Sequence, residues 1–284
     1  MFRGRWRELG LAVLVLVAFY AGYAVLAVLV TRLVERLAGP GGWTVVGRGL
    51  VAASAPALLA MIGVYLGLVK VGRWTGARLR IQGGAASVRW LAVGLVWGVG
   101  LALLVLGLSV VGGARLIATP GPEAWLSVAA PVGLGLALAA LLEELLFRGF
   151  PLVRLADVTG RLVASLALTL LFVAAHWANP VVSALGFVNI GLASLLLSAV
   201  FFSPGGLPAA AGLHFGWNAG LALMADAPVS GLQLRLPAVE YAPGPREWWT
   251  GGTFGPEGGV AAGLVFLGAL AWWWRRGFRV EVAV

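Results

Sequence analysis

Eight stretches of this chain are long and apolar enough to cross a lipid bilayer. A transmembrane helix needs roughly 17 to 25 mainly apolar residues. The apolar windows cover residues 9–31, 44–69, 90–112, 124–150, 161–178, 187–203, 208–226 and 258–274. Hydrophobic residues make up 61% of the chain and charged residues only 11%, a balance that soluble domains do not show. The sequence therefore predicts an all-α, polytopic membrane protein, a bundle of about eight transmembrane helices.

The windows follow one another through short loops, and no polar linker separates two folding units. We therefore expect residues 1–284 to form a single membrane domain. The first window follows the basic segment "MFRGRWRE", but its apolar run from Leu9 to Val30 is too long for a secretory signal peptide. It is expected to remain as an uncleaved first span.

The net charge of +9 would suggest nucleic acid binding in a soluble protein. Here most basic residues fall in segments that share one side of the membrane if the N-terminus is inside, which explains the charge by topology. We therefore expect a lipid bilayer as the partner and no nucleic acid. Both termini are expected to be cytoplasmic, in what looks like a bacterial cell membrane.

The lack of cysteine limits the possible chemistry, and one polar segment limits the possible structure. The chain contains no cysteine, which excludes disulfides, thiolate metal ligands and a cysteine nucleophile. The longest polar segment, residues 227–257, is rich in Pro and Gly and cannot form a long helix. It is interpreted as a surface loop in preference to a lid.

The stretch "LALAALLEELLFRGFPL", residues 136–152, places charged residues inside an apolar window. A carboxylate at the centre of a membrane helix costs about 2.5 to 3.5 kcal/mol on insertion scales. Glu144 and Arg148 are four residues apart, which places them on one helix face as an ion pair. Glu143 points about 100° away and is free of that pair. The pattern indicates a structural pair beside a functional glutamate.

The chain's two histidines also lie in apolar windows, His176 in "LFVAAHWANP" and His214 in "LHFGWNAG". Asn218 follows His214 by four residues, so both project from one face of a helix. Imidazole and amide groups are hydrogen-bond donors suited to an anionic oxygen. These residues are therefore candidates for a site inside the bundle.

A depth estimate tests whether these groups can meet. Glu143 precedes Thr159 by 16 residues and His176 follows Gly160 by 16, so an antiparallel hairpin around this turn brings them level. This requires the fourth helix to continue past Arg148, where Pro151 can instead end it. His214 joins them if residues 178–186 form a loop or broken helix. The bundle would then enclose a polar, water-filled cavity.

Three short motifs resemble those of a known family. "EELLFR", Glu143 to Arg148, is similar to E-E-x-x-x-R; "FVAAH", Phe172 to His176, to F-x-x-x-H; and "HFGWN", His214 to Asn218, to H-x-x-x-N. Together they resemble the CPBP family of intramembrane endopeptidases, which joins CAAX proteases with bacteriocin-processing enzymes. The order of the motifs on separate spans makes the combination more specific than any one of them.

The resemblance implies a catalytic core over about residues 124–226. This core would hydrolyse a peptide bond in a peptide or protein substrate, including substrates associated with the membrane. It implies that Glu143 activates water with the help of His176. It implies that His214 and Asn218 stabilise the oxyanion, with Glu144 and Arg148 as structural support. No cofactor is needed for this reaction.

Three other readings remain open. Glu143, His176 and His214 offer the donor types of a His₂Glu zinc site, as in a metalloprotease. A non-enzymatic membrane partner or bacteriocin-immunity-type protein could use the same cavity for binding. Glutamate and histidine inside membrane spans also occur in proton-coupled transporters.

Overall fold

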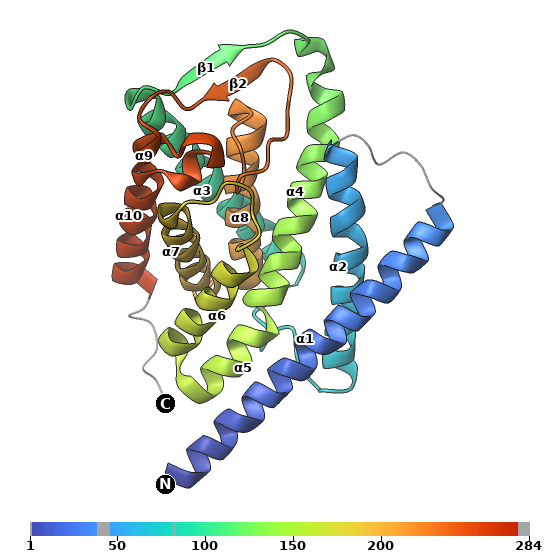
Figure 1. Ribbon diagram of the computed structural model, residues 1–284. Helices are drawn as coiled ribbons and strands as arrows, with labels where there is room; N and C mark the ends of the chain where they lie inside the picture. The colour runs from blue at the N-terminus through green and yellow to red at the C-terminus, as the bar shows by residue number, and fades with distance from the viewer. Residues whose placement is uncertain (1, 39–45, 82, 278–284) are drawn as a thin grey trace.

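The computed structural model describes residues 2–38, 46–81 and 83–277, and nearly all of its regular structure is helical (Figure 1). The α-helices are α1 Phe2–Ala38, α2 Val46–Lys70, α3 Gly84–Val111, α4 Trp125–Phe147, α5 Phe150–Thr159, α6 Arg161–Ala175, α7 Ala184–Phe201, α8 Gly206–Ala225, α9 Glu247–Thr250 and α10 Val260–Gly277. Three 3-10 turns are η1 Pro122–Ala124, η2 Gly252–Phe254 and η3 Pro256–Gly258. The strands are β1 Arg115–Ala118 and β2 Val239–Ala242.

Each of the eight apolar windows corresponds to a helix: α1, α2, α3, α4, α6, α7, α8 and α10. Among the described residues, five helical segments are long and apolar enough to cross a membrane: Trp6–Leu37, Gly47–Lys70, Gly84–Val111, Pro122–Thr159 and Ala184–Phe201. Arg161–Ala175 and Val260–Trp273 are shorter apolar helices. The all-α, polytopic membrane class is confirmed, while length and composition support five crossings where eight were expected.

Helices α3 and α8 lie against each other with almost no side chain between them. Gly94 and Gly98 of α3 face α8, and Gly212 and Gly216 of α8 face α3. A Cβ atom at any of these four positions would overlap with backbone atoms of the other helix. Small residues four apart are the usual means by which membrane helices approach closely. This packing fixes the rotation of α8 and therefore the direction of its polar face.

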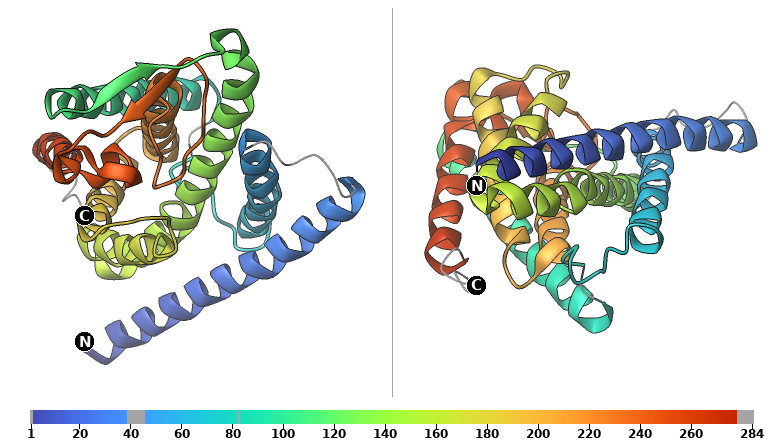
Figure 2. Two further views of the ribbon diagram at one scale, coloured as in Figure 1. Left: turned by 45° about the horizontal axis from the view of Figure 1, so that its top comes forward. Right: turned by 90° about the horizontal axis from the view of Figure 1, so that it is seen from below.

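Helix α1 crosses the outside of the bundle, where it contacts α2 and α5 (Figures 1 and 2). Much of its surface is apolar and exposed, including Leu14 at 67% and Val17 at 60%. Leucine and valine side chains exposed along a helix of this length suit contact with lipid tails. Figure 1 shows the first residues of α1 and the end of α10 at the same end of the molecule, opposite β1 and β2.

The fourth helix does not continue past Arg148, as the hairpin estimate required. Helix α4 ends at Phe147, and α5 begins at Phe150 with Pro151 in its first turn. Pro151 lacks the amide hydrogen that an uninterrupted helix would use, so it fits the start of α5. The prediction of one continuous helix is therefore wrong, and the alternative ending near Pro151 is the one found.

Two tyrosines complete the hydrogen bonds at this break. Tyr20 of α1 donates to the Leu146 carbonyl at 2.9 Å, and Tyr65 of α2 donates to the Leu145 carbonyl at 2.8 Å. The Tyr65 oxygen also accepts from the Phe150 amide at 2.7 Å. The last carbonyls of a helix have no partner within the helix and must find one elsewhere. The tyrosines thus hold the end of α4 that carries Glu143 and Glu144.

The chain between α6 and α7 is irregular up to Ser183, which largely meets the condition set above for residues 178–186. Helix α6 ends at Ala175, and α7 begins at Ala184 after Ser183, whose hydroxyl accepts from the Gly186 amide at 3.0 Å. A serine in this position is a common helix N-cap. The break allows α7 and α8 to bring their polar residues to the same level as the end of α6.

Residues 227–257 do not form a simple surface loop, which corrects that interpretation. Strand β2 pairs antiparallel with β1, with Arg115 opposite Ala242 and Ala118 opposite Val239. Several side chains of the segment are buried, including Leu234, Leu236 and Phe254. The segment is therefore an integral part of the fold at one end of the bundle.

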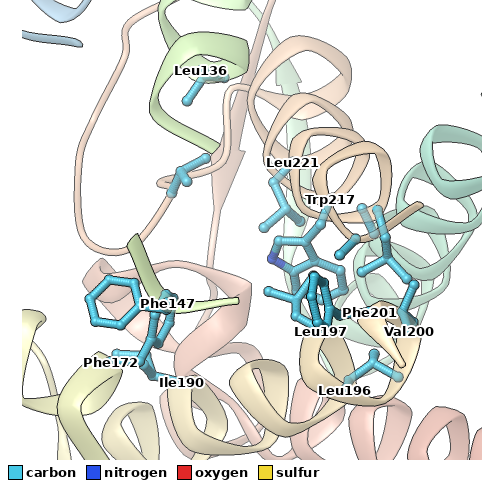
Figure 3. Packing of buried hydrophobic residues seen from close by; sticks show 14 of the residues in the cluster. Leu136, Phe147, Phe172, Ile190, Leu196, Leu197, Val200, Phe201, Trp217 and Leu221 are labelled. Atoms are coloured by element: carbon cyan, nitrogen blue, oxygen red, sulfur yellow. The ribbon is translucent and has the colours of Figure 1, made fainter. Parts of the chain in front are cut away.

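The hydrophobic core extends through the middle of the bundle and surrounds the polar residues. Figure 3 shows part of it, with Leu136 and Phe147 from α4, Phe172 from α6, Ile190 and Leu197 from α7, and Trp217 and Leu221 from α8. The Phe147 and Phe172 rings meet edge to face at 5.1 Å. Helices α4 and α6 are thus in contact one turn away from Glu143 and from His176.

Candidate active site

The last turn of α4 carries a buried ion pair. Glu144 and Arg148 are 0% and 1% exposed, and Arg148 Nη1 donates to Glu144 Oε1 at 3.0 Å. Arg148 immediately follows α4, and its amide still bonds to the Glu144 carbonyl, which keeps the four-residue spacing of a helix. The pair expected from the sequence is therefore formed.

Arg148 also holds α7 through its second amino group. Nη2 donates to the Ser194 hydroxyl at 2.9 Å, and this hydroxyl lies 2.9 Å from that of Thr169 on α6. The guanidinium group lies over the Phe172 ring at 4.4 Å from its centre, a distance suited to a cation–π contact. One arginine thus links α4, α6 and α7.

His214 of α8 lies between the two neighbouring glutamates. Its Nδ1 is 2.9 Å from Glu144 Oε1, and its Nε2 is 3.7 Å from Glu143 Oε2. Glu144 is paired with Arg148 and is therefore read as an ionised carboxylate, which can only accept hydrogen bonds. Nδ1 must then carry the proton, and Nε2 is the ring nitrogen that faces Glu143. The sequence did not indicate this contact between Glu144 and His214.

Glu143 is bound differently from its neighbour. Its side chain is 31% exposed, yet its Oε2 atom is buried and accepts no hydrogen bond from any described residue. The distance of 3.7 Å to His214 Nε2 is too long for a hydrogen bond. As the sequence predicted, Glu144 is paired with Arg148, and the adjacent Glu143 is not part of that pair.

His176 lies at the end of α6, where the helix stops. Its Nδ1 lies 2.7 Å from the Phe172 carbonyl, which can only accept, so Nδ1 carries the proton and Nε2 has a free lone pair. The ring packs on Phe172 at 4.4 Å between centres, and Phe172 also meets the His214 ring at 6.4 Å. Phe172 therefore orients both histidines as well as Arg148.

Three of the expected site residues line one pocket. His176, His214 and Asn218 share it with apolar side chains of α6, α7, α8 and α10, and with Asn189, Ser230 and Glu257. Asn218 is half-buried. Glu143 does not line this pocket but borders it through His214.

The described His, Cys, Asp and Glu side chains form no cluster of the size a metal site needs. In the described ranges, no group of three His, Cys, Asp or Glu side chains lies close enough together to hold a metal ion. The geometry gives no support to a zinc set made of Glu143, His176 and His214.

Some residues at the site could not be identified from the sequence pattern. Ser194 and Thr169 are ordinary residues of membrane helices, and their contact with Arg148 follows only from the packing of α6 on α7. Glu257 was counted with the 227–257 loop. The one available signal was its position as the last acidic residue before the final apolar window, which does not predict burial.

Residues 124–220 match a known protein family, described as Rce1-like, type II CAAX prenyl endopeptidase. The matched segment contains all six expected site residues and lies within the expected core, residues 124–226. No curated protein and no solved structure matches the chain. Residues 124–220 are therefore similar to the Rce1-like domain of the CAAX-protease-like family, which the three motifs also resemble, and this similarity supports an intramembrane peptidase.

Proposed function

We propose that the protein hydrolyses a peptide bond with a water molecule activated by Glu143, without a covalent enzyme intermediate and without a metal ion. The observation that carries this proposal is the contrast between two adjacent carboxylates around one histidine. Glu144 Oε1 is bound by both Arg148 Nη1 and His214 Nδ1, whereas Glu143 Oε2 is buried, has no donor among the described residues and faces His214 Nε2 at 3.7 Å.

In the proposed first step, Glu143 Oε2 accepts a proton from water as the water oxygen attacks the carbonyl carbon of the substrate. A general base needs a free lone pair within hydrogen-bond reach of the water. Oε2 meets the first requirement because no donor from the described residues occupies it. His176 Nε2, with its lone pair free, is suited to accept the second hydrogen of the water and orient it.

In the same step, negative charge develops on the carbonyl oxygen. His214 Nε2 and the Asn218 amide project from one face of α8 and would donate to this oxygen. In this role the His214 ring carries a proton on both nitrogens, and the Glu144 carboxylate at 2.9 Å from Nδ1 favours that charged form. The intermediate then collapses, the C–N bond breaks, and Glu143 returns the proton to the leaving amine.

Glu144 and Arg148 act on this reaction through other residues and are positioning residues in this proposal. Glu144 orients His214, and Arg148 joins Glu144 to Ser194 and to the Phe172 ring that packs on both histidines. Such buried hydrogen bonds keep a site in one arrangement before substrate binds.

The test is cleavage of a quenched peptide library by protein purified in detergent. Wild type, Glu143→Gln and the control Glu123→Gln, which changes an exposed glutamate in η1, are each measured with and without a strong chelator. We expect Glu143→Gln to lose at least about 100-fold in rate, while the control and the chelator leave the rate unchanged. Loss with chelator and recovery with zinc would replace this mechanism by a metal-dependent one.

We also propose that both termini are cytoplasmic in a bacterial membrane. The basic residues of the chain favour this orientation, and the beginning of α1 lies at the same end of the molecule as the end of α10 (Figure 1). Labelling of single cysteines introduced at Trp6 and at Arg275 in intact cells tests it. Reaction with a membrane-impermeant thiol reagent only after lysis is the expected result.

A further inference from the structure

A third carboxylate, that of Glu257, lines the pocket that holds His176, His214 and Asn218. It belongs to the turn η3, which precedes α10 and lies outside the matched residues 124–220. None of the three motifs includes it. The question is what a carboxylate does in a pocket whose other walls are largely apolar.

Neutral groups hold the Glu257 carboxylate in place. Oε1 accepts from Trp217 Nε1 at 2.6 Å, and Oε2 accepts from the Ser230 amide and, at 3.2 Å, from the Ser230 hydroxyl. Figure 3 shows the indole nitrogen of Trp217 on the side of the ring toward Phe147 and Phe172. These bonds orient the carboxylate but leave its negative charge uncompensated, because none of the donors is charged.

The backbone that carries Glu257 is fixed independently of its side chain. Asn189 of α7 is 1% exposed, and its amide nitrogen donates to the Glu257 carbonyl at 2.7 Å and to the Gly259 carbonyl at 2.8 Å. Asn189 lines the same pocket, and its Oδ1 atom is buried without a donor among the described residues. The pocket therefore holds a carboxylate whose backbone is fixed by α7.

The charges at the site do not balance. Three carboxylates, those of Glu143, Glu144 and Glu257, lie in or beside the pocket. In the described part of the chain, Arg148 is the arginine that pairs with this group, and it is bound to Glu144. Even if His214 is protonated, negative charge is in excess, and a charge removed from water is stabilised when an opposite charge approaches it.

We propose that Glu257 binds a positively charged side chain, that of arginine or lysine, close to the cleaved bond of the peptide substrate. The inference rests on the proposed peptidase function and names the substrate class of that site. A guanidinium or ammonium group offers only donors, which matches a pocket lined by a charged carboxylate.

The position of Glu257 along α8 limits where the basic side chain can lie. Its partner Trp217 follows His214 by three residues, which is about 4.5 Å along a helix axis. The shift is toward the end of the bundle that carries β1 and β2. The cationic group therefore belongs to a residue within a few positions of the cleaved bond.

The test uses pairs of cleavable peptides that differ only by arginine or citrulline, which has nearly the same shape and no charge, at each position near the cleaved bond. We expect wild type to have at least about a tenfold higher kcat/KM for the arginine peptide at one position. In Glu257→Gln this ratio falls to near one. Trp217→Phe removes one hydrogen bond but keeps the charge, so its ratio stays close to that of wild type.

The ratio separates recognition of charge from support of the fold. If Glu257 only anchors η3, Glu257→Gln and Trp217→Phe slow both peptides alike, the ratio does not change, and the proposal is overturned. Equal rates of wild type on both peptides overturn it as well. If Glu257→Gln does not fold, Glu257→Asp is measured in its place. This variant retains the charge, so the proposal requires that it still cleave the arginine peptide faster than the citrulline peptide. Activity that requires Glu143 without any charge preference would leave the peptidase function standing and remove this inference alone.

Discussion

Glu144 Oε1 lies 2.9 Å from Nδ1 of His214, on a helix 70 residues further along the chain. The same oxygen is 3.0 Å from Nη1 of Arg148. One buried carboxylate oxygen thus connects the structural pair of α4 to the histidine that faces Glu143. This contact links the stability of the fold to the orientation of the site.

The two neighbouring glutamates are therefore expected to separate stability from chemistry. Glu144→Gln leaves Arg148 as a buried charge without a counter-ion, which typically costs about 3 to 5 kcal/mol. Glu143→Gln removes no hydrogen bond with a described residue and should keep the thermal midpoint of wild type in detergent. Thermal unfolding and peptide cleavage are measured on both variants. A midpoint that falls equally in the two would contradict this division of roles.

Arg148→Lys is expected to destabilise the bundle although the charge is kept. The guanidinium group reaches Glu144 and Ser194 and lies over Phe172 at the same time. The single ammonium group of lysine lacks the planar, forked shape needed to make all three contacts at once. Ser194→Ala is the comparison, because it removes the hydrogen bonds of one neutral hydroxyl to Arg148 and Thr169, at about 1 to 3 kcal/mol for each buried group left unpaired. The thermal midpoint of Arg148→Lys should lie below that of Ser194→Ala, and the reverse order would refute the argument.

Tyr65→Phe is expected to weaken the break between α4 and α5. The hydroxyl donates to the Leu145 carbonyl and accepts from the Phe150 amide, so its removal leaves two buried backbone groups without this partner. Each buried group left unpaired costs about 1 to 3 kcal/mol. Tyr20→Phe removes one bond only and serves as the comparison. Hydrogen exchange at Phe150 should increase in Tyr65→Phe and not in Tyr20→Phe.

Much of the fold follows from apolar length alone. All eight windows are helices, because a run of apolar residues in a membrane must satisfy its backbone hydrogen bonds internally. The β1–β2 pair and the buried turn η3 could not be predicted in the same way. They lie in a Pro- and Gly-rich segment whose conformation is set by contacts with distant residues such as Asn189.

Contacts in the site between residues close in sequence could be predicted, whereas contacts between distant residues could not. The Glu144–Arg148 pair follows from helical spacing, and so does the freedom of Glu143 from it. The bond from Glu144 to His214 depends on how α8 is rotated, which the glycines of α3 and α8 decide. The place of Glu257 depends on an asparagine 68 residues away. No local pattern encodes either relationship.

Asp226→Asn is expected to stabilise the protein at neutral pH. Asp226 follows the last residue of α8, is 6% exposed, and its Oδ1 accepts from the Leu236 amide at 2.9 Å. Burial, together with the nearby Glu240 carboxylate, raises the pKa of Asp226 above its ordinary value. Asparagine keeps the acceptor, lacks the charge, and tolerates the left-handed backbone found here, with φ of 45°.

The sign of the pH dependence follows from proton binding by the two states. The unfolded chain loses the Asp226 proton near the usual pKa of about 4, whereas the folded state holds it to higher pH. In that window the folded state binds more protons, so this group's contribution to stability decreases as pH rises through the folded pKa. The difference in thermal midpoint between Asp226→Asn and wild type should therefore grow from pH 4 upward and then level off. A constant difference across this range would show that Asp226 titrates alike in both states.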